Sequence, residues 1–335
     1  MRRVRSIVER GLAALVAVSV ASCGAATVDV TGLGGNPMPT YTLTTIGTQY
    51  GDSSQFVALN DDGTLAGRVW THGEVENVVI RHSVLVETGT CQPVGINDSG
   101  TIACSDGTTL SGNTRTTVVS SAGGLVPTTL AINDAGQIAG DLVTVSGTPP
   151  SCGPDCTFLW WGPSDTAIVS GRASPSGFVH PGPPVPRLNI TSGLVNVTEV
   201  SHNPPVVTFL PARGLTQTLG CNGVDNTAEF FAIGGNNIVV GESAGDAIMC
   251  SGGTMVSLGF GVANDISRKG VIVGSTGGKG FVFDGTATVL LDNAVNSTQY
   301  SIVSADLVND SGQILATAKD VVTGQTLQVL LSKVQ

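Results

Sequence analysis

The chain has 335 residues, of which 41% are hydrophobic, 12% are charged and 4% are aromatic, and it contains 45 glycines. The low charge and the many aliphatic residues exclude a disordered chain, and the abundance of glycine and threonine favours strands and turns over long helices. The formal net charge of −10 excludes ordinary nucleic-acid binding, because no basic surface is available to replace phosphate counterions. The composition therefore predicts a large all-β protein.

The N-terminus has the pattern of a secretory signal peptide. A basic segment over residues 1–10 precedes an uncharged segment over residues 11–20, which is too short to span a bilayer and has the length of a signal-peptide core. We therefore expect residues 1–22 to be removed as a signal peptide. In the alternative interpretation, an ordinary signal peptide is cleaved near Ala21 or Ala26.

Residues 20–23 (Val-Ala-Ser-Cys) resemble the lipobox of bacterial lipoproteins. This resemblance implies that Cys23 carries a diacylglyceryl anchor with palmitate-type chains, which together are sufficient for stable membrane attachment. If the source is Gram-negative, Gly24 at the following position implies sorting to the outer membrane. The expected location is therefore the bacterial cell envelope, with the membrane as one partner through the lipid.

A tether and an acidic domain are expected after the lipid. Residues 23–40 are rich in Gly, Thr and Pro without periodicity, and such a coil spans about 20 to 25 Å. Removal of residues 1–22 leaves 11 basic and 24 acidic residues, a net charge of −13. Residues 41–335 are predicted to form the folded domain.

Six cysteines remain after Cys23, and an even number in an exported chain indicates disulfides. We expect them to pair in sequence order: Cys91 with Cys104, Cys152 with Cys156, and Cys221 with Cys250. The first and third pairs flank predicted hairpin turns, and the second closes a small loop. Redox activity of the second pair is the alternative, but its cysteines are three residues apart, where thioredoxin-type motifs have two. No histidine stands at a zinc-ligand spacing from these thiols.

One sequence unit recurs along the domain. It consists of an aliphatic residue, Asn-Asp, a variable residue, Gly and a second aliphatic run. Clear copies cover residues 59–67, 96–103, 132–140 and 308–315, degenerate copies cover 233–241 and 266–274, and a faint copy covers 188–195.

Each copy predicts a β-hairpin. Asn-Asp favours the opening of a type I turn, and Gly favours the following position with positive φ, so that the second strand can pair back through a G1 bulge. In the copy at 233–241 the Gly position is taken by Asn237, and asparagine tolerates this conformation better than other non-glycine residues. A calcium loop is the alternative, although it would require more spaced carboxylates and a distal Glu.

The hairpin unit is followed by strand-like segments such as residues 158–162, 255–259 and 280–285. Their succession resembles the HAF-type repeat of bacterial extracellular proteins over most of residues 41–335. The resemblance implies export and a repeated architecture, and it assigns no functional residue.

The repeat spacing predicts the architecture. The turn glycines are 33 to 57 residues apart, which leaves room for about four short strands in each interval. This spacing favours a β-propeller of about seven four-stranded blades. Six or eight blades, a β-solenoid and tandem sandwiches are the alternatives.

The two ends of the domain are expected to share one blade. Residues 41–47 precede the first hairpin as residues 255–259 precede the sixth, whereas the last unit stops at residues 326–331 without an equivalent strand. The N-terminal strand should therefore complete the C-terminal blade and close the ring.

No catalytic residue, metal site or cofactor is predicted. Residues 241–245 match the GxSxG nucleophile elbow, but that motif requires a strand that leads into a helix, and here Gly241 ends a strand of the repeat. The histidines are isolated, without HExxH or HxH pairs: His72, His82, His180 and His202.

The sequence therefore predicts a lipid-anchored scaffold that binds an envelope protein or glycan. A secreted-type enzyme (a lyase or glycosidase) and a purely structural envelope component are the alternatives. The proline-rich residues 171–187 interrupt the repeat beside the expected Cys152–Cys156 loop, so this surface is a candidate partner site with Trp160 and Trp161 as anchors. In the alternative interpretation it is an insertion in an irregular blade.

Overall fold

The computed structural model describes residues 39–46, 51, 53–118, 125–144, 155–162, 165–170, 188–189, 194–195, 197–199, 206–212, 215–224, 228–234 and 238–334. The expected signal peptide, the predicted lipidation site Cys23, Cys152 and the proline-rich segment 171–187 lie outside these residues. Within the described part of the chain, no helix has both the length and the apolar character needed to cross a membrane.

The described strands form antiparallel sheets, six of them with four strands. The first two sheets contain β2 (Ser53–Leu59), β3 (Leu65–Thr71), β4 (Glu74–Arg81) and β5 (Val84–Glu87), then β6 (Pro93–Ile96), β7 (Ile102–Cys104), β8 (Thr108–Ser111) and β9 (Thr114–Thr117). The third contains β10 (Leu125–Ile132), β11 (Ile138–Thr144), β12 (Asp155–Gly162) and β13 (Asp165–Ser170). A two-stranded sheet, β14 (Leu188–Asn189) and β15 (Leu194–Val195), is followed by a three-stranded one, β16 (Val197–Glu199), β17 (Val206–Ala212) and β18 (Leu215–Gly220).

Three further four-stranded sheets complete the chain. They contain β19 (Glu229–Ile233), β20 (Val239–Ser243), β21 (Asp246–Ser251) and β22 (Thr254–Phe260), then β23 (Val262–Ile266), β24 (Ile272–Thr276), β25 (Lys279–Phe283) and β26 (Thr288–Leu290). After the short helix α1 (Leu291–Ala294), the last sheet contains β27 (Tyr300–Val308), β28 (Ile314–Asp320), β29 (Thr326–Lys333) and β1 (Tyr41–Thr45).

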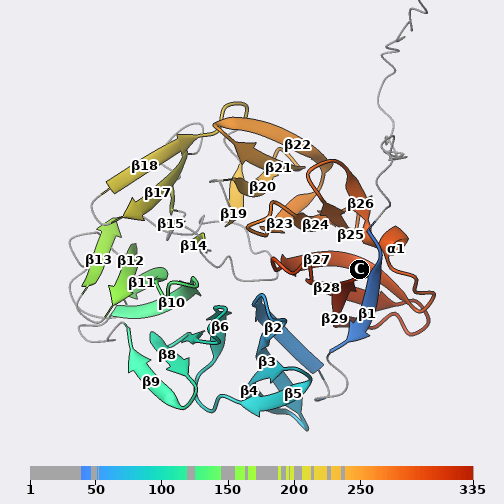
Figure 1. The fold of residues 1–335 in the computed structure, drawn as a ribbon, viewed down its shortest axis with the longest axis horizontal. Helices are drawn as coiled ribbons and strands as arrows, with labels where there is room; N and C mark the ends of the chain where they lie inside the picture. The colour runs from blue at the N-terminus through green and yellow to red at the C-terminus, as the bar shows by residue number, and fades with distance from the viewer. Residues whose placement is uncertain are drawn as a thin grey trace, which may run out of the picture.

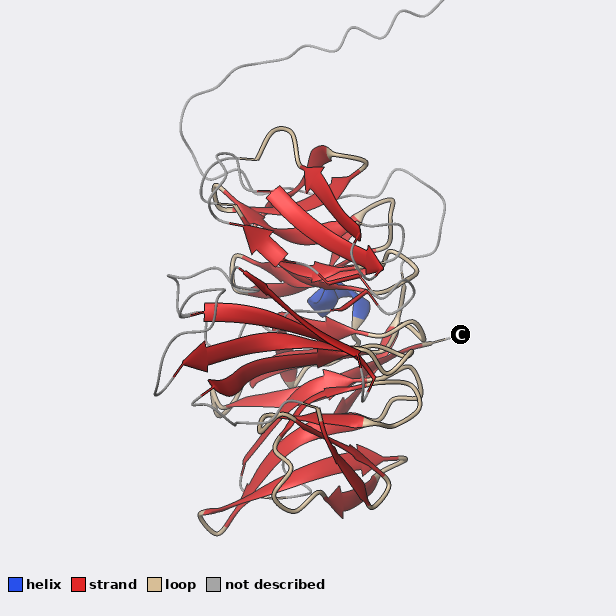
Figure 2. Ribbon diagram, turned by 90° about the vertical axis from the view of Figure 1, so that its left-hand side faces the viewer, coloured by secondary structure: helices blue, strands red, loops and turns tan. Residues whose placement is uncertain are grey.

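The sheets follow one another around a common centre, with strands such as β2, β6, β23 and β27 innermost (Figure 1). Figure 2 shows the ring from the side, composed almost entirely of strands. The prediction of an all-β protein built from four-stranded antiparallel sheets in a propeller-like arrangement is confirmed.

The first and last strands of the domain share one sheet. β1 pairs antiparallel with β29, with Tyr41 opposite Lys333 and Thr45 opposite Val329. The predicted completion of the C-terminal sheet by the N-terminal strand is therefore confirmed.

The repeated units form the predicted hairpins. Their turn glycines all have φ between 76° and 83°: Gly63, Gly100, Gly136, Gly270 and Gly312. Each donates its N–H to the carbonyl three residues earlier, at 2.9 to 3.1 Å. The copies at 188–195 and 233–241 also form strand pairs, although the turn residue Asn237 lies outside the described residues.

A second glycine of the repeat is required by a close approach of the backbone. A Cβ atom at Gly67, Gly241 or Gly274 would lie 1.8 to 2.2 Å from a carbonyl oxygen of the neighbouring first strand. In each sheet the register of that first strand shifts by one residue, as in a β-bulge, and the bulge brings the carbonyl close. The repeat therefore fixes glycine at two positions for two different reasons.

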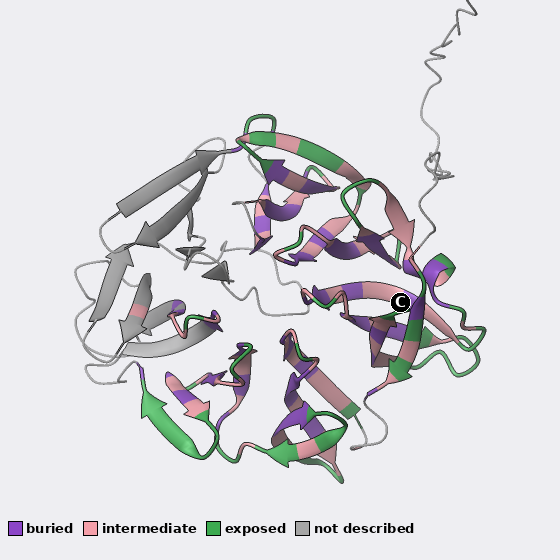
Figure 3. Ribbon diagram, viewed as in Figure 1, coloured by how far each residue is buried: buried purple, intermediate pink, exposed green. Residues whose placement is uncertain are grey.

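The hydrophobic core lies between neighbouring sheets. One cluster joins Phe56 and Val69 of the first sheet to Leu307 and Leu315 of the last, and another joins the first two sheets. Figure 3 shows the buried residues on inner and middle strands, whereas the outer strand β9 is exposed along its length. Burial of this apolar surface, at about 25 cal/mol per Å², fixes each sheet against the next.

Two disulfides connect cysteines in the predicted order. Cys91 pairs with Cys104 and Cys221 pairs with Cys250, with Cα–Cα distances of 5.1 and 6.0 Å. The third predicted pair includes Cys152, which lies outside the described residues, and Cys156 lies in β12 opposite Leu142.

Candidate functional site

Charged side chains from five hairpin turns meet near the centre of the ring of sheets, at the end where the first strand of each sheet turns into the second. The same turn position is occupied by Asp61, Asp98, Asp134 and Asp310 and, in the degenerate copy, by Arg268. The Arg268 guanidinium contacts Asp310 and Asp61 directly and lies 3.3 Å from Asp134 and 3.4 Å from Asp98. We call these five residues the Asp–Arg ring.

The same carboxylates connect successive turns through the backbone. The N–H of Arg268 donates to Asp310 Oδ1, and the N–H of Asp310 donates to Asp61 Oδ1, each at 2.7 Å. The N–H of Asp61 donates to Asp98 Oδ1 and that of Asp98 donates to Asp134 Oδ1, each at 2.8 Å. Four hydrogen bonds thus link five turns that are far apart in sequence.

The asparagines that precede the aspartates form a second, buried layer. Asn60 Nδ2 donates to Asn97 O and Asn97 Nδ2 donates to Asn133 O, both at 3.1 Å, and Asn309 Nδ2 donates to Asn60 O at 2.8 Å. Within its own turn, Asn60 Oδ1 accepts the N–H of Thr64 at 2.8 Å. These amides are therefore satisfied although they are almost completely buried.

This inter-sheet role was not predicted from the sequence, which assigned Asn and Asp only to turn formation. The available signal was the repetition of both residue types, because a type I turn alone accepts several other residues at these positions. The replacement of Asp by Arg268 in one copy was the second signal.

The electrostatics of the Asp–Arg ring are dominated by excess negative charge. Burial, together with repulsion from Asp310 and Asp98, raises the pKa of Asp61 above its usual value. Burial and the nearby Asp134 likewise raise the pKa of Asp98. Burial opposes the charge of Arg268, but the hydrogen bonds and charges of Asp310 and Asp61 raise its pKa. One guanidinium therefore compensates four carboxylates only in part.

A cavity of about 110 Å³ lies against the Asp–Arg ring. Its apolar lining comes from inner strands and includes Ile96, Ile132, Ile266 and Leu307. The described residues include no group of three or more His, Cys, Asp or Glu side chains positioned to hold a metal ion. The four carboxylates bind the Arg268 guanidinium and accept hydrogen bonds from backbone N–H groups of neighbouring turns. The Asp–Arg ring therefore connects the sheets.

The GxSxG segment does not form a nucleophile elbow. Gly241 and Ser243 lie in β20, and the next two residues, Ala244 and Gly245, have φ of 53° and 85° and turn directly into β21. A hairpin therefore stands where the elbow would require a helix.

The predicted partner-binding residues are not part of the Asp–Arg ring. Trp160 lies in β12, where it is partly buried and opposite Ile138 and Thr166. Trp161 follows it in the same strand, and residues 171–187 lie outside the described residues. Of the histidines, His72 and His82 lie in hairpin turns with φ of 54° and 48°.

The chain is similar in fold to several solved structures. No protein-family model and no curated protein sequence matches the chain. An acylaminoacyl peptidase in complex with Z-Gly-Gly-Phe-chloromethyl ketone has a TM-score of 0.50 at 11% identity, over 87% of this chain and 53% of that chain. A gluconolactonase from Xanthomonas campestris has a TM-score of 0.39 at 12% identity, over 90% and 96% of the two chains.

A Pyrococcus horikoshii acylaminoacyl peptidase has a TM-score of 0.47 at 10% identity, over 84% of this chain and 52% of that chain. The chain thus spans about half the length of the two peptidases. At 11% identity the first similarity shows the fold alone. The sheets and this similarity together define the class, an all-β protein with a propeller-like ring of antiparallel sheets.

Proposed function

We propose that this protein is an exported, lipid-anchored β-propeller of seven blades that acts as a binding scaffold in the bacterial cell envelope. The observation that carries the proposal is the Asp–Arg ring, in which the charged side chains at the centre bond to one another and hold the sheets together. A frame joined in this way can present different loops at its rim without loss of the fold. The ligand is a protein or glycan of the envelope.

The count of seven blades is supported by the sheet order. Six four-stranded sheets each begin with one of the repeated hairpins, or with its degenerate form. The hairpin of β14 and β15 coincides with the faint copy at residues 188–195 and is followed by the three-stranded sheet β16 to β18. We assign these two sheets together to the seventh blade.

The position of β1 gives the proposed anchor a direction. Leu43 of β1 lies opposite Leu331, and Leu331 lies opposite Ile314, which directly follows the turn of Asp310. The chain therefore enters the domain at the end that bears the Asp–Arg ring. With the lipid on Cys23, the opposite end of the ring would face away from the membrane.

The test uses purified full-chain protein, immobilised through its C-terminus and exposed to envelope extract and to a panel of envelope polysaccharides. A scaffold retains a specific protein or glycan and releases it unchanged. Release of cleaved or unsaturated products would instead support a lyase or glycosidase, and retention of nothing would support a structural component. A variant in which a Gly-Ser linker replaces residues 172–186 reports whether the proline-rich segment, with Trp160 and Trp161 as anchors, carries the binding.

A further inference from the structure

A cleft between the first two sheets contains an arginine that has no carboxylate partner among the described residues. Arg68 lies in β3, and its Nη2 donates to Gln55 Oε1 of β2 at 2.7 Å. Its guanidinium carbon lies 5.5 Å from the centre of the Trp70 ring, which stands two residues further along the same strand and therefore on the same face. The Trp70 ring and the Gln55 amide hold the guanidinium in place, and the bond to Gln55 uses one of its five N–H donors.

The cleft has the composition of a small polar site with apolar walls. Its volume is about 70 Å³, its walls include Val57, Pro93 and Val94, and its polar side chains are Gln55, Arg68 and Gln92. This volume is sufficient for one oxyanion group and not for a whole sugar or a peptide. Apolar walls exclude water and strengthen the attraction between a guanidinium and an anion.

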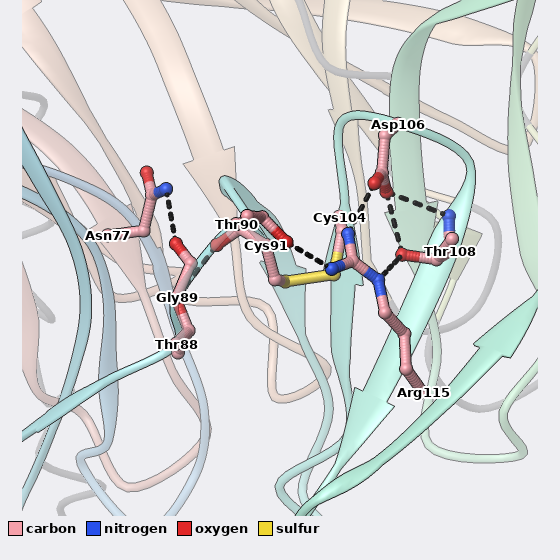
Figure 4. Close-up of a disulfide and its surroundings, with 9 residues drawn as sticks. All are labelled: Asn77, Thr88, Gly89, Thr90, Cys91, Cys104, Asp106, Thr108 and Arg115. Carbon is pink, nitrogen blue, oxygen red and sulfur yellow. Dashed lines mark hydrogen bonds and ion pairs between the residues drawn. A yellow bond between two sulfur atoms is a disulfide. The ribbon is translucent and has the colours of Figure 1, made fainter.

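Figure 4 shows the contacts around the Cys91–Cys104 disulfide, in which Cys91 directly precedes Gln92 of the cleft lining. The disulfide joins Cys91, next to Gln92, to Cys104, while the N–H of Ser105 donates to Gln92 O at 2.9 Å. On the other side, Asn77 Nδ2 donates to Gly89 O at 2.9 Å. Arg115 binds both Thr90 and Asp106. Donors that are held in position before a ligand arrives lose less entropy on binding.

The cleft lies away from the Asp–Arg ring. Leu59 and Leu65 flank the first repeat turn, whereas Arg68 is opposite Gln55, which lies four residues before Leu59, about 13 Å along β2. With the anchor direction proposed above, Arg68 lies further from the membrane than the Asp–Arg ring.

We propose that this cleft binds the carboxylate of an acidic sugar, such as a uronic acid unit of an envelope polysaccharide. The planar guanidinium of Arg68 matches a carboxylate with two parallel hydrogen bonds, and the Gln55 and Gln92 amides supply groups that can bond to sugar hydroxyls. The inference rests on the proposed binding function and names its ligand class.

The test titrates full-chain protein with trigalacturonic acid, with its methyl ester and with inorganic phosphate. Isothermal calorimetry and tryptophan fluorescence report binding, and Trp70→Phe identifies the fluorescence change that comes from the cleft. The acid is expected to bind, and the ester and phosphate are not. Arg68→Ala should weaken binding at least about tenfold, and Arg68→Lys should weaken it less, because lysine keeps the charge and loses the planar fork.

Arg81→Ala is the matched control, because Arg81 ends β4 of the same sheet and its guanidinium lies next to Gly100, at the turn end of the domain. It should bind the acid like the wild type, and unchanged circular dichroism should show that every variant is folded. Equal binding by Arg68→Ala would overturn the assignment to this cleft. Binding of the ester or of phosphate in place of the sugar acid would overturn the ligand class.

Failure of the cleft and failure of the proposed function give different results. If the protein retains a neutral glycan or a protein from envelope extract but does not bind trigalacturonic acid, the binding function stands and the cleft proposal is wrong. If neither the extract nor the sugar panel yields a ligand, the proposed function is wrong as well.

Discussion

Arg268 is the residue on which the centre of the molecule depends. It stands where four other hairpins have Asp, and its side chain contacts all four of those carboxylates. A fifth Asp at this position would add a like charge to a partly buried cluster, and a neutral residue would leave the cluster without a counterion. A single change in one repeat copy thus converts a set of repelling charges into an ion-pair network.

Replacement of Arg268 by Ala should destabilise the domain by about 1 to 3 kcal/mol at pH 7, because four carboxylates lose their counterion in a site that is only partly exposed. Asp61 and Asp98 already have raised pKa values, so their protonated forms are favoured in the folded state. Stability associated with a raised pKa is present at low pH and is lost as pH rises. The loss in the variant should therefore be smaller at pH 4 than at pH 7.

Urea unfolding of both proteins at the two pH values measures this difference. Arg115→Ala is the control, because it removes an exposed ion pair with Asp106. If Arg268→Ala lowered the free energy of unfolding equally at pH 4 and pH 7, packing of the Arg268 side chain, and not its charge, would be what stabilises the domain.

The hairpin is the element that the sequence defines best. Its turn and its bulge are both local: in the first copy the Asn, the Asp and the two glycines all lie within residues 60–67. The second glycine is the more restrictive of the two, because backbone and not a flexible side chain occupies the space of a Cβ atom.

Replacement of Gly241 by Ala should lower the free energy of unfolding by about 2 to 3 kcal/mol, because its Cβ would lie 1.8 Å from the Glu229 carbonyl oxygen and the bulge would have to move. Chemical denaturation measures the effect. Gly73→Asn is the matched control: Gly73 has φ of 84° with open space around it, and asparagine adopts that region readily. Comparable losses in the two variants would argue against a role for the bulge.

Strand β1 is the element that closes the last sheet. Deletion of residues 41–46 should expose the edge of β29, so that the protein either unfolds at lower temperature or forms oligomers through that edge. Thermal scans and size-exclusion chromatography detect the two outcomes. Deletion of residues 24–38, within the expected tether of residues 23–40, is the control and should leave both measurements unchanged. An unaltered thermal midpoint and monomeric elution after deletion of β1 would contradict a closing role.

At the scale of the whole molecule, sequence patterns predicted the hairpins and the disulfide formed by residues close in sequence, together with the missing strand of the last sheet. Cys91 and Cys104 flank one predicted hairpin, and the strand missing after residue 331 pointed to β1. The Asp–Arg ring escaped prediction because Arg268 and Asp61 are 207 residues apart and meet only when the sheets form a circle. The cleft was not predicted because Arg68 lies in β3 of the first sheet, whereas Gln92 directly precedes β6 of the second.

The proposed anchor also concerns the whole molecule. Cys23→Ser should move the protein from the membrane fraction to the soluble fraction, because the thioether that holds the lipid cannot form on serine. Immunoblots of separated fractions measure the change, and Cys91→Ser, which removes a disulfide partner inside the domain, is the control that should stay with the membrane. A Cys23→Ser protein that remains membrane-bound would exclude the lipid anchor.

The pairing of β1 with β29 also sets the order in which the molecule can be made. The Thr42 hydroxyl donates to the carbonyl of Ser332, 290 residues later in the chain, so the last sheet cannot be completed until residue 332 has been synthesised. Contacts this distant in sequence form late, since the loop-closure entropy must be paid before they stabilise the fold. In a chain that crosses a membrane from its N-terminus, β1 would therefore stay unpaired until β29 has also crossed. Pairing of β1 with β29 would be the final step of folding.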